Sequence, residues 1–261
     1  MPQTLIASPK VRFYFIDALR GLGALWVVLF HAHLDDRLDS LEELLPPSLD
    51  AALFEWGSLG VAVFFVLSGF VIAHSLRNAT IDFPYLRQFT LRRLIRLTPP
   101  YYVSIVITLA FSLLAAYAKN EPFKPMNQAF SLERFVSHLF YVQEFVGFVN
   151  FNDVYWTLSL EIQSYLLLCV LIGFAQRLLY QYRIQSAFAI VFVPVALIAA
   201  IFPIAIAPNL GRSIVILPLL YSFLLGVFAH WCWQKKFSRS WFYLYSGVLL
   251  IAGMIHRAGF T

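Results

Sequence analysis

The chain has 261 residues, of which 60% are hydrophobic and only 13% are charged, and its mean hydropathy is +0.73. Soluble domains usually carry about 25% charged residues, so this composition argues against a soluble globular protein. It also argues against an outer-membrane barrel, whose strands are short segments of alternating polarity. The net charge of +5 does not indicate a nucleic-acid partner, because basic residues of membrane proteins collect in cytoplasmic loops. We therefore expect an all-α, polytopic protein of the lipid bilayer.

Seven apolar runs approach the roughly 20 residues that a helix needs to cross a bilayer. They cover residues 13–33, 57–76, 99–118, 154–174, 184–206, 212–233 and 241–255. Residues 83–97 form a basic stretch with apolar side chains at helical spacing, expected at the interface before the chain turns inward at Pro99 and Pro100. Residues 132–148 are interrupted by charges and indicate a re-entrant or interfacial segment. We expect one membrane domain, residues 1–261, folded as a helical bundle.

Basic residues gather in every second loop. Residues 77–98 carry five arginines against one acid, and residues 175–183 and 234–240 are also basic. The first loop of the other side, residues 34–56, carries seven acids against one arginine. The positive-inside rule then places the N-terminus in the cytoplasm of a multi-pass inner or plasma membrane protein. Cys169 and Cys232 both fall in apolar runs, so we expect buried thiols and no metal site.

The stretch "RGLGALWVVLFH", residues 20–31, has an ionisable side chain at each end. Arg20 and His31 are eleven residues apart, so on a helix they share a face, about 16 Å apart along the axis. Arg20 would lie in the inner half of the bilayer and His31 near its outer boundary. Ionisable residues at membrane depth indicate function by default. The alternative is that Asp17 pairs structurally with Arg20 and His31 lies at the interface.

Glu161 interrupts the apolar run "WTLSLEIQSY", residues 156–165. The fourth span enters from the outside, so Glu161 lies about 10 Å below that face, at the depth of His31. A carboxylate beside a histidine orients the ring and stabilises its protonated form, which suits general base catalysis on a hydroxyl. The alternative is a structural hydrogen bond, for example to Trp156 or Tyr165.

Arginines cluster in "RRLIRLTPPYY", which begins at Arg92. Arg93 and Arg96 are three residues apart and lie near one another on a helix, where they could hold the phosphates of a ligand. Anchoring to anionic lipid headgroups is the alternative, and we favour it for Arg77 and Arg87.

Four segments together resemble the integral-membrane acyltransferase 3 family, whose members O-acylate polysaccharides and related molecules with acyl-CoA. "FIDALRGLGALWVVLFHA" resembles the first helix of the family and "GVAVFFVLSGFVI" its second. "RRLIRLTPPYY" resembles its arginine-proline segment, and "WTLSLEIQSYLL" its Trp-Ser-Leu-x-x-Glu motif. In this chain Thr157 stands where serine is common, whereas Glu161 is retained. Family members usually have more helices than the seven counted here, which implies a short member or a fragment that lacks C-terminal helices.

The resemblance implies an O-acyltransferase that moves an acyl group, acetyl by default, from cytoplasmic acyl-CoA to a hydroxyl of a cell-surface carbohydrate or lipid-linked glycan. It implies His31 and Glu161 as catalytic residues, and Arg20, Arg93 and Arg96 as the residues that bind acyl-CoA. The alternative is a transporter or channel that uses the intramembrane polar residues as a path. The acceptor, the acyl chain, direct or relayed transfer, and the oligomeric state stay open.

Overall fold

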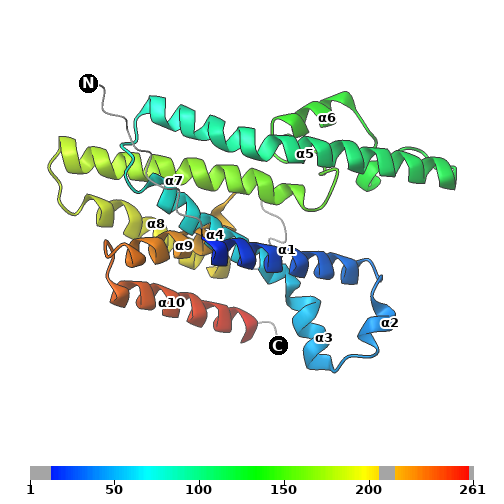
Figure 1. Cartoon of the computed structure of the whole chain (residues 1–261), viewed down its shortest axis with the longest axis horizontal. Coiled ribbons are helices and arrows are strands. Elements are labelled where there is room, and N and C mark those ends of the chain that lie inside the picture. The colour runs from blue at the N-terminus through cyan, green and yellow to red at the C-terminus, as the bar shows by residue number, and fades with distance from the viewer. Residues whose placement is uncertain (1–12, 206–214, 259–261) are drawn as a thin grey trace, which may run out of the picture. The chain divides into compact units, whose positions relative to one another are not determined.

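The computed structural model describes residues 13–205 and 215–258, and all the regular structure in these residues is helical (Figure 1). The chain divides into two compact units. The N-terminal unit ends at Leu67 and the C-terminal unit begins at Ser68, within helix α4. We describe each unit by itself.

The N-terminal unit contains α1 (Tyr14–Leu34), α2 (Asp39–Glu42), α3 (Pro47–Leu53), the short 3-10 helix η1 (Glu55–Ser58) and the start of α4 (Leu59–Leu76). Its helices approach closely because glycines face α1. A Cβ atom on Gly57 would lie 2.6 Å from the carbonyl oxygen of Trp26, and one on Gly60 would lie 2.6 Å from Val27 Cγ2. The Trp26 indole also donates to the carbonyl of Ala52 (2.9 Å). These contacts tie α1 to the segment that enters α4.

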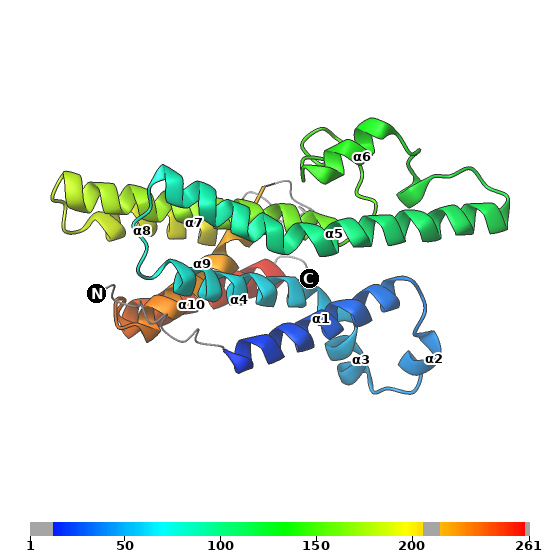
Figure 2. The ribbon, with the colours of Figure 1, turned by 45° about the horizontal axis from the view of Figure 1, so that its top comes forward.

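The C-terminal unit contains the rest of α4, α5 (Phe83–Lys119), η2 (Pro125–Asn127), α6 (Leu132–Leu139), α7 (Tyr155–Gln181), α8 (Ala187–Ala205), η3 (Leu217–Leu219), α9 (Leu220–Trp233) and α10 (Arg239–Ala258). Helices α5 and α7 run side by side in both views (Figures 1 and 2). Helix α8 contacts α7, α9 and α10. Gly69 lets α4 approach α9, because a Cβ there would lie 2.0 Å from the carbonyl oxygen of Phe223.

Four stretches are long and apolar enough to cross a membrane, within the part of the chain that is described: Tyr14–Leu34, Pro47–Leu76, Phe83–Lys119 and Tyr155–Gln181. Two further apolar helices are shorter, Ala187–Ile201 and Leu217–Trp233. An all-α membrane protein is therefore confirmed. The predicted span ends at Ile206 and Arg212 lie outside the described residues. Cys169 is buried and Cys232 is half-buried, and both are free thiols.

The predicted turn at Pro99 and Pro100 is wrong, because both prolines lie inside the continuous helix α5. Proline removes a backbone donor and normally kinks or ends a helix, but helices that pack against neighbours tolerate it. In α5 the residues that follow the two prolines pack against neighbouring segments. Tyr101 and Ile105 belong to a buried cluster that also contains Tyr141, Phe151 and Tyr155.

The predicted interfacial segment contains only one short helix, α6, which is too short to span a bilayer. Arg134 on α6 is fully buried, and its guanidinium donates to the carbonyl oxygens of Pro125, Gln128, Val149 and Asn150 at 2.8–3.2 Å. It also lies over the Phe151 ring, 4.4 Å from the centroid. Arg134, one of the charged residues that interrupt the apolar pattern, therefore holds the surrounding loops together by hydrogen bonds to their carbonyl groups.

Candidate active site

Glu161 lies on α7 within a helix apolar enough to span a membrane. Its Oε1 accepts a hydrogen bond from the Tyr165 hydroxyl, one helical turn later on the same face. Ser68 Oγ on α4 donates to the same oxygen at 3.4 Å. The structural partner considered from the sequence, Tyr165, is thus present, and α4 contributes a second donor.

Arg93 on α5 lies over the aromatic ring of Tyr165. Its guanidinium is 5.6 Å from the centroid of the Tyr165 ring and 5.2 Å from that of Phe89. Its Nη2 donates to Ser75 Oγ at 2.9 Å. Planar cations stack on aromatic faces in this way. Tyr165 therefore contacts the cation with its ring and the carboxylate with its hydroxyl.

We call Ser68, Ser75, Arg93, Glu161 and Tyr165 the polar chain. It joins α4, α5 and α7 inside the C-terminal unit. Tyr165 is buried, and Arg93 and Glu161 are half-buried. A cation and a carboxylate among apolar helices are costly in lipid and mark functional sites by default. Hydrogen bonds in such low-dielectric surroundings are also stronger than in water.

The other arginines of the cluster differ from Arg93 in exposure. Arg96 lies one turn further along α5 and is exposed. Arg92 is exposed as well, with its guanidinium 5.9 Å from the centroid of the Tyr85 ring. Of these three side chains, Arg93 is therefore the one held beside Glu161 and Tyr165, whereas Arg92 and Arg96 present their charge outward.

His31 and Arg20 lie on α1 in the N-terminal unit, and both are half-buried. The Nδ1 atom of His31 is 2.8 Å from the carbonyl oxygen of Val27. Because a carbonyl only accepts, Nδ1 carries the proton, and the neutral ring keeps its lone pair on Nε2. His31 can thus act as a base through Nε2. Its pairing with Glu161 stays a prediction.

Two partners in the polar chain were missed from the sequence. Ser68 is not among the site residues predicted from the sequence, yet its hydroxyl bonds Glu161. Ser75 was not considered, and it accepts from Arg93. Among the described residues, no three His, Cys, Asp or Glu side chains gather closely enough to hold a metal ion.

Comparison with known proteins gives a family match over most of the chain. A family model described as an acyltransferase domain, Acyl_transf_3, matches residues 13–256. The O-acetyltransferase OatA of Staphylococcus aureus is 28% identical over 206 residues, which cover 71% of this chain and 29% of that protein. The peptidoglycan O-acetyltransferase OatA of Listeria monocytogenes is 28% identical over 167 residues, covering 58% of this chain and 23% of that protein.

A third relative comes from an animal. The regulator of hypoxia-inducible factor 1 of Caenorhabditis elegans is 29% identical over 179 residues, covering 62% of this chain and 34% of that protein. The chain thus spans about a third or less of the length of these relatives. No solved structure matches it.

Proposed function

This chain belongs to the acyltransferase 3 family, and we propose that it is a membrane O-acyltransferase. The donor is acyl-CoA, acetyl-CoA by default, bound from the cytoplasm. The acceptor is a hydroxyl of a cell-surface carbohydrate or a lipid-linked glycan. The names of the two bacterial relatives, both O-acetyltransferases, support this choice. We further propose that residues 1–261 act as one acyltransferase domain, with the N-terminus in the cytoplasm.

The observation that carries the proposal is the polar chain, in which Arg93, Tyr165 and Glu161 follow one another between apolar helices. An acyltransferase that works across a membrane needs a cation for the phosphates of its donor and an acid–base group for the hydroxyl of its acceptor. Arg93 can supply the cation for the phosphates, and Glu161 can support the acid–base group.

In the proposed reaction, Arg93 and Arg96 hold phosphates of acyl-CoA, and Arg20 contacts the arm that carries the thioester. Nε2 of His31 removes the proton of the acceptor hydroxyl, and Glu161 stabilises the resulting imidazolium. The hydroxyl oxygen forms a bond to the acyl carbon as the carbon–sulfur bond breaks. The proton on His31 then passes to the departing thiolate, which leaves as free CoA.

The test uses purified protein, acetyl-CoA labelled in the acetyl group, and a glycan acceptor, with transfer and hydrolysis both measured. His31→Ala is expected to lower the transfer rate by at least about 100-fold, since general base catalysis contributes 10²–10⁴-fold. His33→Ala is the matched control, because His33 lies on the same helix and bonds Glu42 (2.6 Å).

Wild type that neither binds acyl-CoA nor uses its acyl group would overturn the function. Full activity of His31→Ala would overturn the residue assignment and leave the reaction class standing.

A further inference from the structure

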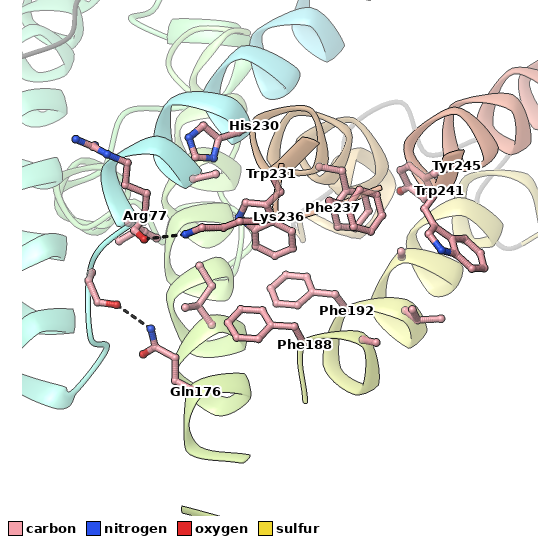
Figure 3. A pocket seen from close by; sticks show the side chains of 18 of the residues that line it. Arg77, Gln176, Phe188, Phe192, His230, Trp231, Lys236, Phe237, Trp241 and Tyr245 are labelled. Atoms are coloured by element: carbon pink, nitrogen blue, oxygen red, sulfur yellow. Dashed lines mark hydrogen bonds between the residues drawn. The ribbon is translucent and has the colours of Figure 1, made fainter. Parts of the chain in front are cut away.

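A cavity of about 910 Å³ lies inside the C-terminal unit, apart from the polar chain. Its wall comes from the end of α4 and from α7, α8, α9 and α10 (Figure 3). This volume is in the range of sites that hold small molecules. Most of its lining is apolar, with aromatic side chains on several sides: Phe188, Phe192, Phe228, Trp231, Phe237 and Trp241.

Two cations, Arg77 and Lys236, belong to the described lining of this cavity. In Figure 3 the Lys236 side chain passes beside Trp231 and points towards Arg77, and its ammonium donates to the carbonyl oxygen of Arg77 at 3.3 Å. That bond uses one of the three donors of an ammonium group. The guanidinium of Arg77 donates instead to the carbonyl oxygen of His74 (2.8 Å), at the end of α4. Lys236 is therefore placed to meet an anionic group at the edge of the cavity.

Another polar group in the lining is His230. Its side chain is only 1% exposed. The Nε2 atom lies 3.3 Å from Nδ1 of His74, whereas its Nδ1 has no hydrogen-bond partner within the described part of the chain. The Nδ1 atom is itself buried under neighbouring protein atoms. His230 therefore belongs to the wall of the cavity, and Lys236 is the polar side chain that we assign to a ligand.

We propose that the cavity binds an anionic phospholipid, with its phosphate at Lys236 and an acyl chain among the aromatic residues of α8, α9 and α10. The apolar wall fits a hydrocarbon chain, and the Lys236 ammonium fits one phosphate. Basic pockets between membrane helices bind the headgroups of anionic lipids elsewhere. The site is separate from the proposed acyl transfer and does not depend on it.

The test is native mass spectrometry of the purified full chain in detergent, titrated with palmitoyl-oleoyl phosphatidylglycerol or phosphatidylcholine. Wild type is expected to retain phosphatidylglycerol at least fivefold more tightly than phosphatidylcholine. Lys236→Gln should abolish this preference. Lys235→Gln is the matched control, because Lys235 is exposed as Lys236 is but is not part of the lining. This variant should retain the preference.

Leu197→Trp provides a second variant, since Leu197 lines the cavity and is already 56% exposed. Its larger side chain should occupy the space of the acyl chain and lower the affinity for phosphatidylglycerol. Equal binding of the two lipids by wild type would overturn the proposal. So would an equal loss in Lys235→Gln and Lys236→Gln, or displacement of the bound lipid by palmitoyl-CoA at equimolar concentration.

Discussion

The hydroxyl of Tyr165 donates a hydrogen bond to the carboxylate of Glu161, while the ring of the same tyrosine lies against the guanidinium of Arg93. One side chain thus joins the two charges that the proposed reaction uses. The hydroxyl and the ring can be separated by substitution, so their contributions can be measured independently.

Tyr165→Phe removes the hydroxyl and keeps the ring. Hydrogen bonds to charged groups contribute about 1.5–3 kcal/mol, so we expect kcat for acyl transfer to fall by about tenfold or more. The KM for acyl-CoA should change little, because the ring still contacts Arg93. Steady-state kinetics with varied acyl-CoA separates the two constants. Tyr182→Phe, at the exposed end of α7, is the control; equal rates for the two variants would show that the hydroxyl has no role.

Arg93→Gln tests the phosphate site. Losing a charge-assisted contact of about 1.5–3 kcal/mol should weaken acyl-CoA binding by about tenfold or more. Arg87→Gln removes the same charge from an exposed position on the same helix and should leave affinity within about twofold. Equilibrium binding of labelled acyl-CoA measures the affinity of both variants. An equal loss of affinity in the two variants would indicate a general effect of surface charge and contradict a phosphate site at Arg93.

The first two membrane helices could be predicted from the sequence because each needs a long apolar run. The first and last residues of that run mark approximately where the helix begins and ends. The predicted residues 13–33 and 57–76 differ from α1 and α4 by at most two residues at either end. The contact between Glu161 and Tyr165 was also foreseeable, since side chains four residues apart meet on a helix.

Contacts between segments could not be predicted in the same way. Arg93 meets Tyr165 because α5 and α7 lie side by side, and no spacing in the sequence reports which helices are neighbours. The same holds for Arg134, which has a charge typical of an exposed position. Its burial depends on carbonyl groups from several loops that converge on it.

Gly69→Ala is expected to destabilise the C-terminal unit. The added Cβ would lie 2.0 Å from the carbonyl oxygen of Phe223, and backbone must move to relieve this clash. Overpacking of this kind costs about 1–3 kcal/mol. Gly247→Ala on α10 is the control, because a Cβ there meets nothing within 4 Å. Thermal unfolding in detergent should give a lower Tm for Gly69→Ala alone, and an unchanged Tm would contradict this packing.

His138 on α6 is expected to make the loops around it sensitive to acid. Its side chain is fully buried. Its Nδ1 donates to the carbonyl of Arg134 (2.8 Å), and its Nε2 accepts from the Phe151 amide (3.1 Å). The ring must therefore be neutral in the folded state. Burial, aided by the charge of Arg134, lowers the pKa of His138 from 6.5 to about 4.

The unfolded loop therefore binds a proton at a higher pH than the folded loop does. The stabilisation from neutral His138 is complete above pH 6.5 and is lost as the pH falls from 6.5 towards 4, by about 3 kcal/mol in total. Hydrogen exchange of the Phe151 amide, followed between pH 7 and pH 4.5 and corrected for intrinsic rates, should report weaker protection in acid. The glutamine of His138→Gln cannot titrate in this range, so the protection of the Phe151 amide in this variant should change less with pH. If the wild type and this variant changed in parallel, another group would have to be responsible for the acid sensitivity.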